Sequence, residues 1–418
     1  MSSQPMGVAP TRAAALEALG DFLPRAGRAY AKARNYDFGP ATRGNVSNLS
    51  PYTRHRIISE QEIVQRVLER HALSSAEKFI QEVCWRSYWK GWLEHRPQLW
   101  SHYLDALEDD RRNLQTDDAM ASAYAEAVEG RTGITCFDAW AKELQETGYL
   151  HNHARMWFAS IWIFTLELPW TLGGDFFYNH LYDGDPASNT LSWRWVGGLQ
   201  TKGKTYLARS DNIATFTDGR FLQTPQLSGV AEPLEDNLPV LTKTPLQQRN
   251  TPLPNTPAIL LLHEDDLHPQ SLGLDLSDLK GIAFLPADIS RLALSEGVLA
   301  FKSAAANAAL QAASSELDIP AMSEVASIDT VQDHLDTAAN LTAFCKSVGA
   351  QTIITPEAPV GPSRMALDAV EQCLAANSIA LHRIRRDWDN AFWPHAKAGF
   401  FKLKEKIPGV LAELGVAR

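Results

Sequence analysis

Apolar side chains in the first 200 residues recur with the period of a helix. Over residues 11–22 they fall on one face, and residues 74–95 form a second, strongly aromatic stretch that Ser74 or Ser75 can cap. Ser59 and Glu62 have the spacing of a capping box and predict a further helix start. Almost no segment before Gln200 alternates like a strand. The pattern therefore predicts an all-helical first half.

The pattern changes after residue 257. Short apolar runs with the length of buried strands begin at Ala258, Ile282, Thr352 and Ile379, and helical segments lie between them around residues 301–313, 331–347 and 363–376. Alternating strands and helices predict a doubly wound parallel sheet. The expected domains are a helical domain over residues 1–220, a proline-rich linker over 221–256 and an α/β domain over 257–418.

Composition narrows the class of protein. The 418 residues carry a formal net charge of −10, which argues against a generally basic nucleic-acid binder but allows a local basic rim around a pocket. Neither a membrane-spanning run nor a signal peptide is expected. The four cysteines are scattered without metal-ligand spacing, so no metal site is predicted and a reducing cytoplasm is the expected compartment.

The chemically richest stretch runs from His151 to Trp195. It holds five tryptophans, interleaved with polar and charged residues such as Asn152, Arg155 and Asp183. Tryptophan is large and is seldom placed without a packing or binding role. An apolar aromatic site with a few placed polar groups suits a large flat cofactor.

Several motifs occur in one order from Ala14 to Trp195: N-V-S-N-L-S-P-Y, E-V-C-W-R-S-Y-W, T-G-I-T-C-F-D-A-W, H-N-H-A-R-M and D-G-D-P-A-S-N-x-x-S-W-R-W. This set resembles the flavin-binding core of the photolyase/cryptochrome family. The resemblance implies FAD as cofactor and blue light as the energy source. It covers less than half of the chain.

The resemblance also implies cofactor contacts, several of which have a physical reading. Ser47 and Ser50 lie just before a helix, where hydroxyl and amide groups suit a diphosphate. Arg155 and Asp183 would form a charged pair against the flavin ring, although a structural salt bridge is the alternative. Asn189 would face flavin N5, where a carboxamide can donate or accept. The full predicted set is Tyr36, Ser47, Asn48, Leu49, Ser50, Glu82, Arg86, Asn152, Arg155, Asp183, Asp185 and Asn189.

Trp193 and Trp170 match two members of the electron-transfer chain of the family. The third member has no match, since no tryptophan lies near Asp117. Trp157, Trp162 or Trp100 could replace it, or the chain could be interrupted. The alternative is that these tryptophans are simply core residues.

Five residues match the lesion pocket of cyclobutane-dimer photolyases and would act catalytically: Glu82, Trp85, Asn152, Met156 and Trp195. Damaged DNA is the partner that this implies, with the lesion flipped into the pocket. A basic rim is expected from Arg43, Arg194, Lys202 and Lys204. Two departures from the family pattern count against repair: His153 replaces an arginine, and an arginine expected shortly after Tyr36 is absent.

Two functions therefore remain open. The first is repair of cyclobutane pyrimidine dimers by photoinduced electron transfer, and the second is a blue-light receptor without repair activity. A flavoprotein of unrelated chemistry is a third alternative. The family places its α/β domain before the helical one, so the order here suggests a circular permutation, or an unrelated α/β domain fused on. A second, antenna chromophore cannot be assigned from the sequence.

Overall fold

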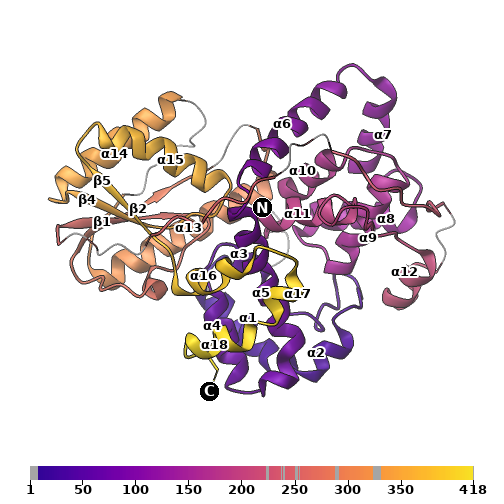
Figure 1. Cartoon of the computed structure of the whole chain (residues 1–418), viewed down its shortest axis with the longest axis horizontal. Coiled ribbons are helices and arrows are strands. Elements are labelled where there is room, and N and C mark those ends of the chain that lie inside the picture. Colours follow the sequence, from indigo (N-terminus) through magenta and orange to yellow (C-terminus); the bar gives the residue numbers. More distant parts are fainter. Residues whose placement is uncertain are drawn as a thin grey trace, which may run out of the picture.

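The computed structural model describes residues 8–222, 226–236, 238, 241–249, 253, 255–287, 291–322 and 331–417. Parts of the predicted linker, among them Pro225, Pro239, Pro252 and Pro254, lie outside the described residues. Figure 1 shows a lobe of helices beside a smaller lobe built on a sheet. Within the described part of the chain, no helix has the length and hydropathy needed to cross a membrane.

The first half is helical, as predicted. Its helices are α1 (Arg12–Phe22), α2 (Arg28–Ala33), α3 (Ser50–Arg54), α4 (Glu60–Leu68), α5 (Leu73–Glu94), α6 (Gln98–Asn113), α7 (Asp118–Val128), α8 (Thr135–Thr147), α9 (Asn152–Phe164), α10 (Trp170–His180), α11 (Pro186–Val196) and α12 (Ser210–Phe216). The acidic stretch after residue 100, which has only weak periodicity, is nevertheless helical in α6 and α7.

The helix starts follow the polar residues that can cap them, with one exception. The hydroxyl of Ser59 accepts a hydrogen bond from the Glu62 backbone amide at 3.2 Å, so the predicted start of α4 is confirmed. The predicted cap of α5 is wrong. Ala72 precedes the first helical residue, and Ser74 and Ser75 already lie inside the first turn. The sequence pattern predicted helix α5 correctly, but neither of the two serines near its start caps it.

The second half contains the predicted parallel sheet. The strand order is β3-β2-β1-β4-β5, with every neighbouring pair parallel. The strands are β1 (Ala258–His263), β2 (Leu279–Leu285), β3 (Ala321–Met322), β4 (Thr352–Pro356) and β5 (Ala380–Ile384). Strand β3 was not predicted, because an edge strand of two residues has no readable pattern.

Helices cover both faces of this sheet. On one face, alternate residues of β1 and β2 pack with Leu341 of α14 (Val331–Ser347) and Leu367 of α15 (Pro362–Ala375). On the other face, Leu260 and Leu262 belong to the core that includes α13 (Glu296–Leu317) and the helical half. The doubly wound α/β fold is therefore confirmed, and one continuous core joins it to the helices.

The chain returns to the helical half after β5. Helices α16 (Asp387–Phe392), α17 (Phe400–Lys404) and α18 (Ile407–Glu413) lie beside α1, α4 and α5, as the yellow ribbon in Figure 1 shows. The indole nitrogen of Trp388 donates to Ser87 of α5 at 2.8 Å, and the Tyr88 hydroxyl donates to the Ala398 carbonyl at 2.9 Å. The predicted domain boundaries remain a prediction, but this last segment packs on helices rather than on the sheet.

The two halves meet at the carboxyl edge of the sheet. In an open parallel sheet, ligands usually bind where the strand order reverses, here between β1 and β4. The residues that follow β1 are buried and acidic, and arginines from the helical half reach them. Arg54 contacts Glu264 at 2.9 Å and also Asp265, while Arg56 lies 3.4 Å from Asp266. The usual ligand crevice is thus filled by side chains of the other half.

Candidate functional site

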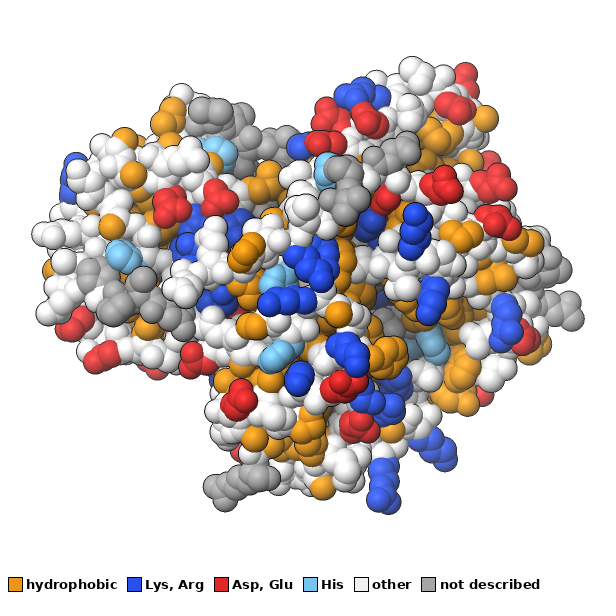
Figure 2. All heavy atoms as spheres, viewed as in Figure 1, with side chains coloured by type: hydrophobic (Ala, Val, Ile, Leu, Met, Phe, Trp, Pro, Cys, Tyr) orange, Lys and Arg blue, Asp and Glu red, His pale blue; other side chains and the backbone are white. Residues whose placement is uncertain are grey.

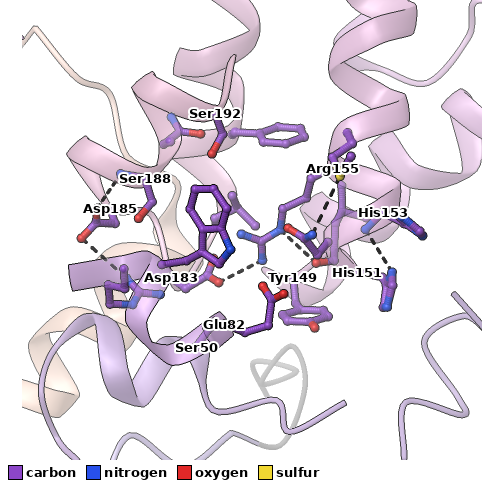
Figure 3. Close-up of a pocket in the computed structure, with 18 of the residues that line it drawn as sticks. Ser50, Glu82, Tyr149, His151, His153, Arg155, Asp183, Asp185, Ser188 and Ser192 are labelled. Carbon is purple, nitrogen blue, oxygen red and sulfur yellow. Dashed lines mark hydrogen bonds and ion pairs between the residues drawn. The ribbon is translucent and has the colours of Figure 1, made fainter. Parts of the chain in front are cut away.

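A cavity of about 520 Å³ lies within the helical half. This volume is in the range of sites that hold cofactors. Side chains from α2, the loop before α3, α5, α9 and α11 surround it. Figure 3 shows several of them, among them Glu82 of α5, Arg155 of α9 and Ser188 of α11. Elements distant in sequence therefore build one site.

Most of the predicted site residues line this cavity. They are Ser47, Asn48, Leu49, Ser50, Glu82, Trp85, Arg86, Asn152, Arg155, Met156, Asp183, Asp185, Asn189, Trp193 and Trp195. Tyr36 and Trp170 are not among the lining residues. Tyr36 stacks on Phe38 at 5.4 Å and meets Phe216 at 5.3 Å, so the residue expected to close over the cofactor instead packs in an aromatic cluster.

Arg155 and Asp183 form the predicted charged pair. One terminal guanidinium nitrogen of Arg155 donates to Asp183 at 2.9 Å, and its Nε donates to the Leu150 carbonyl at 2.9 Å, which fixes the plane of the guanidinium. Burial alone raises the pKa of Asp183, but Arg155 and Arg86 outweigh it and hold this pKa below its ordinary value. Asp183 is therefore ionised at neutral pH and fixed in place.

Further predicted contact residues are held by the backbone around them. Asp185 caps α11 by accepting a hydrogen bond from the Ser188 amide at 2.7 Å. The side-chain nitrogen of Asn189 donates to the Gly174 carbonyl at 2.7 Å, which sets the orientation of its carboxamide. Asn48 has a φ of 53°, a left-handed conformation that asparagine tolerates better than most residues. These positions are held by the backbone around them.

Glu82 does not stand alone in the cavity. It forms an ion pair with Arg34, which follows α2 and also lines the cavity. Burial raises the pKa of Glu82, and Arg34 opposes this without cancelling it. The predicted lesion contact thus already has a cationic partner within the protein.

The other predicted lesion residues form the apolar part of the wall. Trp85 stacks on Phe400 of α17 with ring centroids 3.7 Å apart, so one face of its indole is covered by the C-terminal segment. Trp195 stacks on Tyr206 at 5.6 Å. Asn152 is exposed and its amide approaches the Met156 sulfur at 3.9 Å. An aromatic and sulfur-containing wall of this kind suits a flat, largely apolar ligand.

Sequence reasoning did not assign a site role to several lining residues: Tyr30, Arg34, Tyr149, His151 and His153. His151 and His153 contact the backbone carbonyls of Arg34 and Asn35, at 3.0 and 2.7 Å, and so tie the start of α9 to the chain after α2. Burial lowers the pKa of His151 to about 4, so this ring is neutral. The H-N-H spacing was the available signal, since its first and third residues carry these contacts.

The positions of the tryptophans are known, but the electron path through them stays a prediction. Trp193 lines the cavity, and its ring centroid lies 6.1 Å from that of Trp162. Trp170 is 5.5 Å from Tyr103, and Tyr103 is 5.5 Å from Trp100. Gly173 makes room for this arrangement, because a Cβ there would lie 2.3 Å from the Trp193 ring. Trp157 instead stacks on Trp140 at 5.5 Å.

The predicted basic rim is wrong for two of its four residues. Arg43 is buried and pairs with Glu143 at 2.5 Å, and Arg194 is buried and pairs with Asp236 at 2.6 Å. Both charges are neutralised inside the protein and are not presented to a nucleic acid. Lys202 and Lys204 are exposed as expected.

The cavity fits a large polar-edged aromatic cofactor such as FAD. Among the described residues, some buried polar atoms of its lining form no hydrogen bond within the protein, including Asn48 Oδ1 and Trp193 Nε1. Buried polar atoms need partners, so these atoms are suited to a ligand. Hydroxyls of Ser47 and Ser50 lie with them, while tryptophans supply the apolar wall.

Comparison with known proteins agrees with this geometry. Residues 79–220 match the family model described as the FAD binding domain of DNA photolyase. The deoxyribodipyrimidine photo-lyase of Streptomyces griseus is 33% identical over 181 residues, covering 40% of this chain and 38% of that protein. The chain thus spans less than half the length of this curated relative.

Two solved structures match about half of this chain. A bacterial class III photolyase from Agrobacterium tumefaciens matches with 29% identity and a TM-score of 0.41, covering 50% of this chain and 43% of that one. A cryptochrome from Synechocystis sp. PCC6803 matches with 22% identity and a TM-score of 0.38, covering 51% and 44%. Residues 79–220 are thus similar to the FAD-binding domain of DNA photolyases, and the cofactor that this match supports is FAD.

Proposed function

We propose that this protein is a light-dependent lyase that splits cyclobutane pyrimidine dimers in DNA. One observation carries the proposal: the predicted flavin contacts and the predicted lesion contacts line the same cavity. A lesion on Trp85 and Trp195 would therefore lie next to a flavin held by Arg155, Asp183 and Asn189. Relatives that match this chain are named deoxyribodipyrimidine photo-lyase, which supports the proposal.

Bound FAD would supply the light-driven electron-transfer chemistry that opens the dimer. The protein would hold the flipped lesion and stabilise the charge that develops on it. Glu82 can hydrogen-bond a thymine of the lesion, and Asn152 at the exposed edge can add an amide contact. Trp85 and Trp195 would provide the apolar walls for the two bases.

DNA binding would come from local rather than total charge. Figure 2 shows Lys and Arg side chains gathered across the middle of the visible face, while Asp and Glu concentrate at the upper right, over α6 and α7. Such separation lets an acidic protein attract a phosphate backbone locally.

A blue-light receptor without repair activity is the second candidate. Glu82 is already paired with Arg34, and two of the expected rim cations are buried, and both observations favour this candidate. A lesion would have to compete with Arg34 for Glu82. In a receptor, the same pair would simply close the mouth of the cavity.

The deciding experiment measures splitting of a thymine dimer in single-stranded DNA under blue light, with FAD fully reduced. We expect the wild-type protein to split the dimer. Glu82→Gln should lower the yield per bound FAD about tenfold or more, since a hydrogen bond to a charged group contributes about 1.5–3 kcal/mol.

Glu77→Gln is the matched control, because Glu77 lies on the same helix, half exposed, and does not line the cavity. It should leave the yield unchanged. If the reduced wild-type protein neither binds nor splits the dimer but is still photoreduced, the repair proposal fails and the receptor takes its place.

A further inference from the structure

Asp185 is surrounded by three cations. Its side chain is buried, and its Oδ2 atom lies 3.5 Å from Arg86 Nη1, 3.5 Å from Lys90 Nζ and 4.0 Å from Arg54 Nε. Arg86 shares the cavity wall with Asp185, whereas Lys90 and Arg54 lie behind it. The charge that a bound ligand experiences at this wall thus depends on side chains that it does not touch.

The two rear cations continue into the α/β half. Arg54 Nη1 forms an ion pair with Asp265, and Lys90 Nζ lies 3.9 Å from the same carboxylate. Asp265 comes two residues after β1, and its other oxygen accepts a hydrogen bond from Ser363 of α15 at 2.5 Å. A carboxylate of the sheet domain is therefore connected through two buried cations to the carboxylate at the flavin cavity.

The neighbouring residue has different partners. Asp266 is equally buried, but it accepts two hydrogen bonds from Arg386 at 2.6 Å, and its other cationic partner is Arg56 at 3.4 Å. Within the described part of the chain, its ion pairs include neither Arg54 nor Lys90. Two adjacent aspartates of the same charge and burial thus differ in whether they reach Asp185.

Burial makes these charges act strongly on one another. Charges in a low-dielectric interior are poorly screened, so removing one anion leaves its cations to act on the remaining groups. Loss of Asp265 would make the surroundings of Asp185 more positive. A more positive site favours the reduced flavin, which carries more negative charge than the oxidised flavin.

We propose that Asp265 is a positioning residue that holds Arg54 and Lys90 against Asp185 and thereby sets the reduction potential of the bound flavin. The α/β half then contributes to the redox properties of the cofactor without contacting it. The inference rests on the same cavity as the proposed function, through the predicted contact of Asp185 with the flavin.

The test uses the full-length FAD-loaded protein and measures the midpoint potential of the flavin by spectroelectrochemical titration. Asp265→Asn should shift the reduction equilibrium toward reduced flavin by tenfold or more, which is about 30 mV for a two-electron couple. Asp266→Asn, with the same charge change next door, should shift it by less than threefold. Far-ultraviolet circular dichroism of each variant checks that the helices remain.

Ser363→Ala is the milder second variant, because it removes one hydrogen bond from Asp265 and keeps the charge. It should shift the potential in the same direction by a smaller amount, and it keeps the test available if Asp265→Asn does not fold. Equal shifts in Asp265→Asn and Asp266→Asn, or no shift in Asp265→Asn or Ser363→Ala, would overturn the inference.

The outcome is separable from that of dimer repair. A wild-type protein that binds FAD, shows the Asp265 shift and does not split dimers refutes the proposed function alone. A wild-type protein that takes up no FAD refutes both.

Discussion

The helical half and the α/β half both bury many charged side chains, but they use them differently. At the carboxyl edge of the sheet, the acidic residues after β1 are paired with arginines and a lysine, as in the contacts of Arg54, Arg386 and Lys302. In the helical half, Arg86, Asp183 and Asp185 face a cavity. At the edge of the sheet the paired charges hold the two halves together, whereas in the helical half the paired charges also line a cavity, where a ligand can reach them.

This comparison reverses what fold class alone suggests. A doubly wound sheet normally binds its ligand at the carboxyl ends of its strands, and a helical domain has no such default position. Here Arg54 fills the usual ligand position at the carboxyl ends of the strands. The cavity of about 520 Å³ lies among the helices instead. The first four predictions below test this division, from the largest expected effect to the smallest.

The largest effect is expected for Arg54→Ala. Removing this buried side chain leaves Asp265 without its main cation and removes one of two cations paired with Glu264, and breaking a buried pair on one side costs about 3–5 kcal/mol. The free energy of unfolding, measured in urea, should fall by this amount. Arg112→Ala, whose partners are exposed, should change it by no more than about 0.5 kcal/mol. A loss of the same small size in both variants would show that the contact between the halves is not structural.

Arg155→Ala should act on the cofactor rather than on stability. It leaves Asp183 buried without its partner at the cavity wall, so the affinity for FAD should fall about 100-fold, or about 2.7 kcal/mol. Fluorescence titration of the apoprotein with FAD measures this. Arg131→Ala removes an arginine from an exposed pair and should leave the affinity unchanged. Unchanged FAD affinity in Arg155→Ala would place the flavin elsewhere.

Gly173→Ala tests the packing around Trp193. The added methyl group would lie 2.3 Å from the indole, and overpacking of this kind costs about 1–3 kcal/mol. We expect a lower melting temperature and slower blue-light reduction of the flavin, because Trp193 must move. Gly20→Ala, with open space around its Cβ, should slightly stabilise the protein. Photoreduction at the wild-type rate in Gly173→Ala would argue against a role of Trp193 in the electron path.

The smallest effect concerns pH and the contact between the halves. Burial and the charge of Arg54 lower the pKa of His55 to about 4, while its ordinary value is 6.5. The unfolded chain therefore binds a proton below pH 6.5 that the folded protein binds only near pH 4, so stability falls as the pH decreases through this window. Between pH 7 and pH 5 the loss from one such histidine is about 1–2 kcal/mol.

His55→Gln is the informative variant, because an amide can still donate to the Glu264 carbonyl, 2.7 Å from the ring, but does not titrate. Its melting temperature should depend less on pH over this window than that of the wild-type protein. An identical dependence in both proteins would mean that His55 is not the group responsible.

Local patterns predicted most of the secondary structure. The capping serine of α4, the strands at Ala258 and Thr352 and the helix over residues 331–347 follow from periodicity and propensity, and the structure confirms them. The two-residue strand β3 and the alanine before α5 could not be predicted, because neither carries a side-chain signal.

The ordered motifs identified which residues line the cavity, but not which side chains those residues contact. The D-G-D-P-A-S-N segment led to Asp183, Asp185 and Asn189, all of which line the cavity. The pairing of Glu82 with Arg34, the covering of Trp85 by Phe400 and the burial of Arg43 depend on contacts between distant segments. Nothing in the local sequence indicates them. The permutation of domain order remains a prediction, because the family match covers only residues 79–220.

The most direct measurement is a crystal structure of the full chain loaded with FAD. We expect flavin density in the cavity of the helical half, with Arg155, Asp185 and Asn189 in contact with the ring system and the hydroxyls of Ser47 or Ser50 in contact with the diphosphate. Arg54 should remain paired with Asp265 at the edge of the sheet. FAD bound instead at the carboxyl ends of β1 and β4, with Arg54 displaced, would contradict the division of roles between the two halves.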